Sequence, residues 1–126
     1  MANGTIAFDT LQTSGQITGT AKSVDTDYVV NGSAKSWVHC NQSTAVIDES
    51  FNSASLTDDG TGLSTIAFTN SMSSASFSAH CTHHDNIKNA AVGAFATGSY
   101  RLDSRNDAAT FADQTNMCGT VHGDLA

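Results

Sequence analysis

Short runs of alternating hydrophobic and polar residues fill the stretch between residues 34 and 77. Trp37 and His39 would lie on one face of a strand, with Val38 and Cys40 on the other. A period of two places successive side chains on opposite faces of a sheet, so these runs predict half-buried strands. The same pattern along the rest of the chain predicts strands over residues 34–41, 44–51, 53–58, 63–70, 74–82, 91–104 with a break at Gly98, and 116–123.

Glycine, asparagine and aspartate mark the turns, because the chain contains no proline. The run Asp58-Asp59-Gly60-Thr61-Gly62 separates two predicted strands. It predicts a hairpin loop, since glycine accepts a positive φ and aspartate bonds its own backbone. A calcium loop would need a different spacing of ligands. Short strands with regular turns predict an all-β fold, an antiparallel β-sandwich over residues 34–126.

The predicted core takes apolar side chains from every strand. Residues 103–115 form a polar excursion around Phe111, either a loop that places this ring under the sheet or one helical turn at residues 107–113. The core is thin for so many strands, so we expect copies of the chain to bury further surface by associating. The predicted core residues are Trp37, Val38, Cys40, Val46, Ile47, Phe51, Leu56, Ile66, Phe68, Met72, Phe77, Val92, Phe95, Tyr100, Leu102 and Val121.

Residues 1–33 differ from the rest, because glycine and small polar residues interrupt every apolar run. The pattern predicts a strand from Thr5 to Leu11 and a second one at Tyr28-Val29-Val30. Neither run can build a core alone. We expect residues 1–33 to be an N-terminal anchoring arm that packs on another copy or a larger assembly, or else an edge strand of the same domain. The anchoring side chains would be Ile6, Phe8, Leu11, Tyr28, Val29 and Val30.

Composition narrows the classes of partner. The chain has 126 residues, a net charge of −7 and only 5 Lys and Arg residues. Phosphate contacts need basic side chains, so we expect no nucleic-acid partner. An acidic surface also disfavours anionic membranes, and no run is long enough for membrane insertion. The N-terminus lacks a basic and apolar leader, so we expect no signal peptide and synthesis in the cytoplasm of the producing cell.

The chain has 3 cysteines, Cys40, Cys81 and Cys118, which lie far apart in the sequence. An odd number of cysteines cannot all pair within one chain. Each falls in a predicted strand, which favours small buried thiols. One disulfide between two of them is the alternative.

The run His80-Cys81-Thr82-His83-His84-Asp85-Asn86 concentrates side chains that bind Zn²⁺ or Ni²⁺. On a strand, His80 and Cys81 would point to opposite faces and could not share an ion, and no established metal motif occurs. The run is either a solvated polar turn or a source of one histidine per chain, from His80, His83 or His84, for an ion on a threefold axis. We expect no resident metal or cofactor.

No catalytic constellation stands out. The sequence contains no G-x-S-x-G elbow, no phosphate-binding loop and no pair of facing carboxylates. His39 and His122 fall in predicted strands, where a lone histidine is more often a hydrogen-bonded interface residue than a ligand. We therefore expect a protein that is not an enzyme, with a free sugar-active enzyme as the contrary class.

Six motifs at the centre and both ends of the chain share one family pattern. They are Ala34-Lys35-Ser36-Trp37-Val38, Ser50-Phe51-Asn52-Ser53-Ala54-Ser55-Leu56-Thr57-Asp58, Gly60-Thr61-Gly62, Ile66-Ala67-Phe68-Thr69-Asn70-Ser71-Met72, Met117-Cys118-Gly119-Thr120-Val121-His122-Gly123-Asp124 and the lead-in from Ile6 to Gly15. These motifs resemble a family of bacteriophage virion proteins that is common in phages of marine bacteria and is usually described as tail-fibre or fibre-like. The chain departs from the usual pattern at Cys40 and at Leu63-Ser64.

The resemblance implies a virion structural protein, a short tail or head fibre that forms a homotrimer. Residues 1–33 would mount it on tail, portal or capsid proteins, and exposed loops would contact a glycan or protein of the host surface. The loop contacts would be His83, His84, Asp85 and Asn86, with Trp37 as a further candidate that its size and strand position otherwise assign to the core. The alternative is a capsid decoration protein that stabilises the shell.

Overall fold

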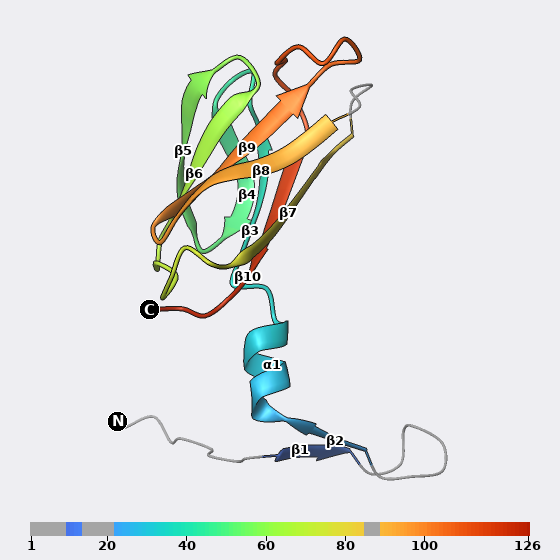
Figure 1. Cartoon of the computed structure of the whole chain (residues 1–126), viewed down its shortest axis with the longest axis vertical. Helices are drawn as coiled ribbons and strands as arrows, with labels where there is room; N and C mark the ends of the chain where they lie inside the picture. Colours follow the sequence, from blue (N-terminus) through green and yellow to red (C-terminus); the bar gives the residue numbers. More distant parts are fainter. Residues whose placement is uncertain (1–9, 14–21, 85–88) are drawn as a thin grey trace. The chain divides into compact units, whose positions relative to one another are not determined.

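The computed structural model describes residues 10–13, 22–84 and 89–126, with side chains from residue 29 onward (Figure 1). The chain divides into two compact units, Met1–Ser33 and Ala34–Ala126. In the first unit, strand β1 (Thr10–Thr13) pairs antiparallel with β2 (Lys22–Asp25), and helix α1 (Thr26–Gly32) follows.

The predicted strand at Tyr28-Val29-Val30 is wrong, because these residues lie in α1. Two valines favour a strand, but a strand needs a partner for its backbone groups and a helix satisfies them internally. Asp and Thr are favoured where a helix begins and glycine where it ends, and the run from Asp25 to Gly32 has this order. Val29 and Val30 are exposed. Of the other predicted anchoring residues, Leu11 lies in β1, while Ile6 and Phe8 fall outside the described residues.

The second unit confirms the predicted all-β sandwich. Two four-stranded antiparallel sheets have the strand orders β4-β3-β10-β7 and β5-β6-β9-β8. The predicted strand 91–104 is divided at Gly98 into the hairpin β8–β9. The bounds are β3 Ser36–Asn41, β4 Val46–Phe51, β5 Ser53–Gly60, β6 Leu63–Phe68, β7 Ser78–His83, β8 Asn89–Ala96, β9 Ser99–Arg105 and β10 Met117–His122.

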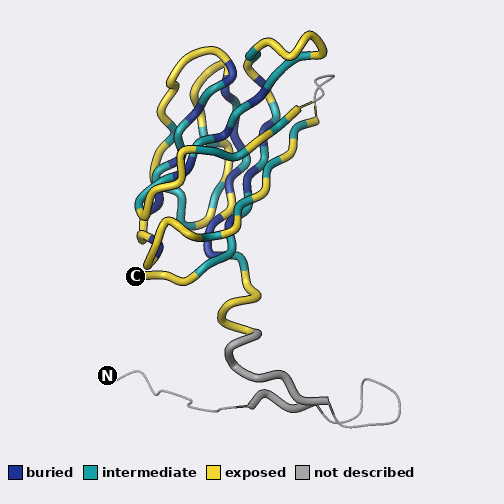
Figure 2. Tube along the Cα trace, in the orientation of Figure 1, coloured by how far each residue is buried: buried dark blue, intermediate teal, exposed yellow. Residues whose placement is uncertain are grey.

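Buried and less buried residues alternate along the central strands of both sheets (Figure 2). Every second residue is buried along β3, β6, β9 and β10, as a period of two requires. Aromatic rings extend the core at one end, where Phe68 stacks on Tyr100 and Phe77 meets both rings edge-on. The buried core is Val38, Cys40, Ile66, Phe68, Met72, Tyr100, Leu102, Met117 and Val121.

Four predicted core residues are exposed instead: Trp37, Val46, Phe51 and Phe95. The predicted alternation on β3 is correct, but the predicted core includes side chains from both faces of this strand. The fold buries Ser36, Val38 and Cys40, because burying the Trp37 face would also bury His39 and Asn41. Ile47, Leu56, Phe77 and Val92 are partly buried against the core.

The hairpin at residues 58–62 is confirmed. Gly60 donates its backbone N–H to Asp58 Oδ1 at 2.8 Å, and the turn itself is Thr61-Gly62. Gly62 has φ +70°, and a Cβ there would lie 2.5 Å from the Ser104 carbonyl oxygen. Both backbone conformation and space therefore require glycine.

The excursion after β9 is a loop without the alternative helical turn. Phe111 forms an isolated bridge with Arg105, whose guanidinium carbon lies 3.8 Å from the centre of the Phe111 ring. The ring is partly exposed. A cation–π contact thus replaces the predicted burial under the sheet.

Candidate interaction surfaces

Two aromatic side chains stand on the outer face of the β4-β3-β10-β7 sheet. Trp37 on β3 lies directly opposite Phe51 on β4, and their exposed fractions are 39% and 53%. The same row continues from Trp37 to Thr120 on β10 and to His80 on β7. Directly opposed side chains on one face lie within contact distance. The row therefore changes from apolar to polar across the sheet.

A second row on this face carries the charged groups. Glu49 on β4 lies opposite His39 on β3, which lies opposite Cys118 on β10. His39 Nδ1 is 3.7 Å from Asp48 Oδ2, a contact between side chains that are both more than 40% exposed. Such an exposed pair contributes at most about 1 kcal/mol.

The structure separates the histidine-rich run, as its alternation predicted. His80 is exposed on the outer face, 3.3 Å from Ser78 Oγ, whereas Cys81 is partly buried on the inner face. His83 ends β7 and His84 follows it, while Asp85 and Asn86 fall outside the described residues. Within the described ranges no group of three or more His, Cys, Asp and Glu side chains could hold a metal ion.

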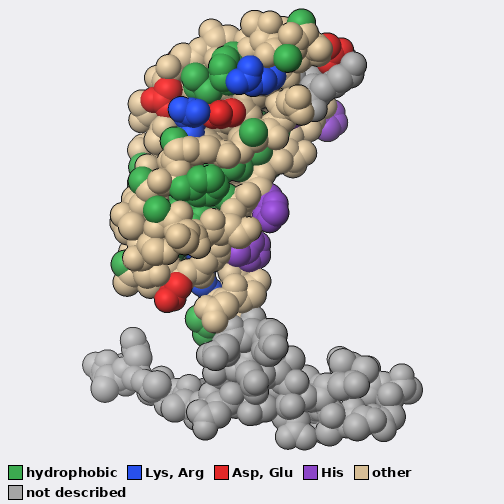
Figure 3. All heavy atoms as spheres, viewed as in Figure 1, with side chains coloured by type: hydrophobic (Ala, Val, Ile, Leu, Met, Phe, Trp, Pro, Cys, Tyr) green, Lys and Arg blue, Asp and Glu red, His purple; other side chains and the backbone are tan. Residues whose placement is uncertain are grey.

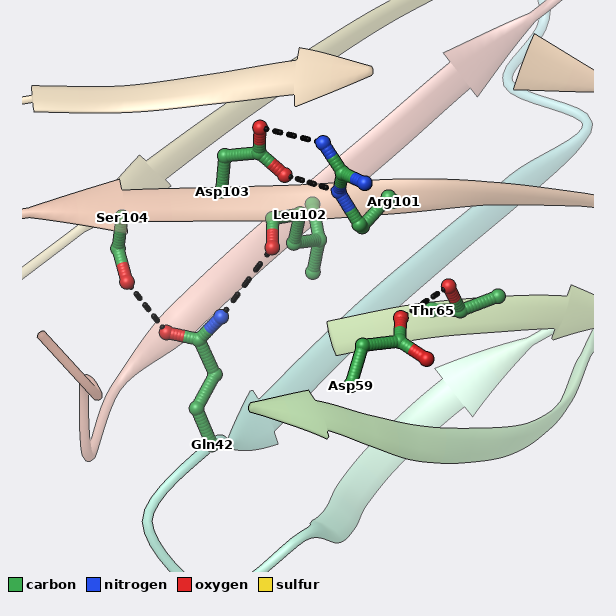
Figure 4. A network of polar contacts seen from close by, with 7 residues as sticks. All are labelled: Gln42, Asp59, Thr65, Arg101, Leu102, Asp103 and Ser104. Carbon is green, nitrogen blue, oxygen red and sulfur yellow. Dashed lines mark hydrogen bonds and ion pairs between the residues drawn. The ribbon is translucent and has the colours of Figure 1, made fainter. Parts of the chain in front are cut away.

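At one end of the sandwich a buried polar network joins two loops, and Figure 4 shows its contact between Gln42 and Ser104. Ser104 donates its hydroxyl to Gln42 Oε1 at 2.7 Å, and the Gln114 N–H donates to the same oxygen at 3.2 Å. The Gln42 N–H donates to the Gln114 carbonyl at 2.8 Å. All three side chains are buried. The β3–β4 turn is thereby fixed to the β9–β10 loop.

The first residues of the second unit lie at the opposite end of the sandwich. There the Lys35 N–H donates to the Val121 carbonyl at 2.8 Å. The Asn52 side-chain amide donates to the Lys35 carbonyl at 2.9 Å and accepts from the Asn70 N–H at 2.7 Å. Sequence reasoning missed both polar networks, since no local pattern marks an Asn or Gln that folding will bury.

The outer face of the β5-β6-β9-β8 sheet is balanced in charge. Arg101 makes a two-pronged ion pair with Asp103, at 2.6 and 3.0 Å. Thr65 donates its hydroxyl to Asp59 at 2.5 Å. Acidic and basic side chains lie side by side in Figure 3, with histidines along one border of the domain. Through the hydrogen bonds of this ion pair, the Asp103 carboxylate raises the pKa of Arg101 above its ordinary value.

The cysteines are free, and the strand register excludes a disulfide within the chain. Cys40 and Cys81 lie on strands separated by β10, about 10 Å apart, beyond the span of a disulfide. Cys118 is on β10 but faces the opposite side of the sheet from both. Burial raises the pKa of Cys40 to about 12 and that of Cys81 to about 11. The alternative of an internal disulfide is therefore wrong.

No family model, curated protein or solved structure matches this chain. Within the described ranges no helix is long and apolar enough to cross a membrane.

Proposed function

We propose that the protein is a non-enzymatic structural component of a bacteriophage particle, a short fibre whose β domain adheres to the host surface. The sequence resemblance to fibre-like virion proteins supports this assignment. Residues 1–33 would form the mount on tail, portal or capsid proteins. The loop end of the β domain would then make the contact with a host glycan or protein.

The observation that carries the proposal is the position of the loop end. The β3–β4 turn, the β5–β6 turn, His84 and the β9–β10 loop lie at the end of the sandwich that is opposite Ala34. The buried contacts of Gln42 with Ser104 and Gln114 hold the β3–β4 turn against the β9–β10 loop. The Gly62 N–H of the β5–β6 turn donates to Asp113 Oδ1 of the same loop. A fixed cluster of loops on a rigid scaffold is the usual place for recognition. Many copies on one particle would turn weak contacts into useful avidity.

The first test locates and counts the protein in purified particles. Quantitative mass spectrometry against the major capsid protein gives its copy number, and an antibody against residues 34–126 gives its position by electron microscopy. About a dozen copies at the tail or a vertex support a fibre, whereas hundreds of copies spread over the shell support a decoration protein. Absence from mature particles overturns both assignments.

The second test measures adhesion to host cells. Labelled protein is expected to bind susceptible cells, and the double change His83→Ala with His84→Ala is expected to weaken binding at least fivefold if the loop end makes the contact. Thr57→Ala, an exposed change on β5, is the matched control and should bind like the natural protein. Equal binding by both variants would remove the loop end from the proposal. Turnover of cell-surface polysaccharide would contradict the non-enzymatic assignment.

A further inference from the structure

The outer face of the β4-β3-β10-β7 sheet has two unlike halves. The half formed by β4 and β3 carries the exposed rings of Trp37 and Phe51 and the carboxylates of Asp48 and Glu49. The half formed by β10 and β7 carries short hydroxyl side chains and histidines, with no Asp or Glu in either strand. Its outward residues are Ser78, His80, Thr82, Cys118, Thr120 and His122.

Charge makes the two halves complementary. None of these four strands contains Lys or Arg, so histidine is the only side chain of this face that can become positive. His39 already faces Glu49 and Asp48 of its own chain. His80 faces Thr120 on β10 and lies between Ser78 and Thr82 on β7. Strand β8 of the other sheet contacts β7 and has no charged residue. His122 lies near Lys35 and Asp124. His80 and His122 are thus the outward histidines without a carboxylate on a neighbouring strand, and of the two only His80 lies in the row of Trp37 and Phe51.

A symmetry axis parallel to these strands brings unlike halves together. Whether the axis is twofold or threefold, it sets the β4–β3 half of one copy against the β10–β7 half of the next. Sheets that pack face to face keep their strands within about 30° of each other, so this arrangement agrees with ordinary sheet packing. The row across the sheet runs Phe51, Trp37, Thr120 and His80. In this row, Phe51 of one copy would face His80 of the next, and Trp37 would face Thr120.

We propose that copies of this chain associate through this sheet face, with Trp37 and Phe51 of one copy covered by the Thr120 and His80 half of the next. The rings leave water, and the acidic edge on β4 of one copy approaches the histidine edge of its neighbour. Because histidine changes its charge between pH 5 and 8, the association should tighten as the pH falls. The inference goes beyond the proposed function and does not depend on it.

The test uses the full chain and measures its mass by analytical ultracentrifugation between about 5 and 200 µM, at pH 6 and pH 8. Trp37 is the only tryptophan, so its fluorescence reports directly on this face. We expect a dimer or trimer whose dissociation constant is lower at pH 6. A blue shift of the emission should accompany the rise in mass, because association covers the ring.

Variants assign the contact to this face. Trp37→Ser and Phe51→Ser are each expected to raise the dissociation constant at least tenfold. His80→Gln should reduce the difference between pH 6 and pH 8. Leu125→Ser is the control, since it removes an apolar side chain of similar exposure, 40%, from another part of the domain. Thermal unfolding of each variant checks that it is folded.

Three outcomes would overturn the inference. The first is a single-chain mass at every concentration and both pH values. The second is an oligomer that Trp37→Ser and Phe51→Ser leave unchanged, because the copies would then meet elsewhere. The third is a Trp37 emission that responds to soluble saccharides while the mass remains that of one chain, because the face would then belong to a glycan.

Discussion

The hydroxyl of Tyr100, on β9 of one sheet, reaches across the core to the backbone of Gly119, on β10 of the other. A Cβ placed on Gly119 would lie 2.6 Å from this oxygen and 3.3 Å from Leu102 and Val38 side-chain carbons. The ring is fully buried, and its hydroxyl has no hydrogen-bond partner among the described residues. Gly119 is therefore needed for space, and the residue that requires the space is Tyr100.

Gly119→Ala is expected to lower the free energy of unfolding by about 1–3 kcal/mol, because the added methyl group overpacks the core. Tyr100→Phe is expected to leave it unchanged or raise it by about 1 kcal/mol, because removing an unpaired buried hydroxyl removes its desolvation cost. Urea unfolding of both variants gives the two changes.

The double variant tests whether the two residues are coupled. Phenylalanine lacks the atom that meets the new Cβ, so the double variant should be more stable than the sum of the single changes predicts. Simple additivity would show that the strain at Gly119 comes from Leu102 and Val38 instead.

The cysteines give a prediction about chemical labelling. In dilute native protein, Cys118 is expected to react first with iodoacetamide, because it lies on the outer face of its sheet. Cys40 and Cys81 face the interior, and burial raises the pKa of both thiols, so they should react much more slowly. Peptide mass spectrometry after brief labelling measures the order. Mild oxidation should produce no intramolecular disulfide, and a peptide linking two cysteines of one chain would contradict the strand register.

The sequence patterns predicted the strands well because the alternation is local. On β6, Ser64, Ile66 and Phe68 are buried as their spacing requires. Local patterns do not say which face of a strand meets the other sheet, and Trp37 shows the limit. Its size favours burial, but the strand keeps His39 out of the core and therefore exposes Trp37. The inward Gln42 and Gln114 depend on partners more than 60 residues away in the chain, which no local pattern reports.

Alkaline pH should destabilise the fold through its buried acidic groups. The pKa of Cys40 rises from 9.0 to about 12 and that of Cys81 to about 11, mainly through burial, and the pKa of Tyr100 also rises. A raised pKa favours the protonated form in the folded state. The resulting stability is complete below pH 9 and is lost as the pH rises toward 12.

The measurement is the free energy of unfolding from urea titrations between pH 8 and about pH 11. Cys40→Ala should reduce the loss of stability over this range, because one titrating group is absent. Val38→Ala is the matched control, since it truncates a neighbouring core side chain that does not titrate. It should lower stability at every pH and keep the slope of the natural protein. Equal slopes for all three proteins would exclude Cys40 as a source of the alkaline transition.

The loop end supplies the last prediction, which joins stability to the proposed function. Gln42→Ala removes the acceptor of the Ser104 hydroxyl and of the Gln114 N–H, and both donors lie in the buried interior. The Ser104 hydroxyl can still donate to the Ala112 carbonyl at 2.6 Å. The Gln114 N–H is then the donor left unpaired, so a loss of about 1–3 kcal/mol is expected in urea unfolding. The β3–β4 turn and the β9–β10 loop should also lose protection in hydrogen exchange before the rest of the sandwich does.

Asn52→Ala, at the opposite end, removes hydrogen bonds to Lys35 and Asn70 and should leave the loop end protected. If both variants loosen the loop end equally, Gln42 does not hold it, and the fixed arrangement on which the proposed host adhesion depends has another source.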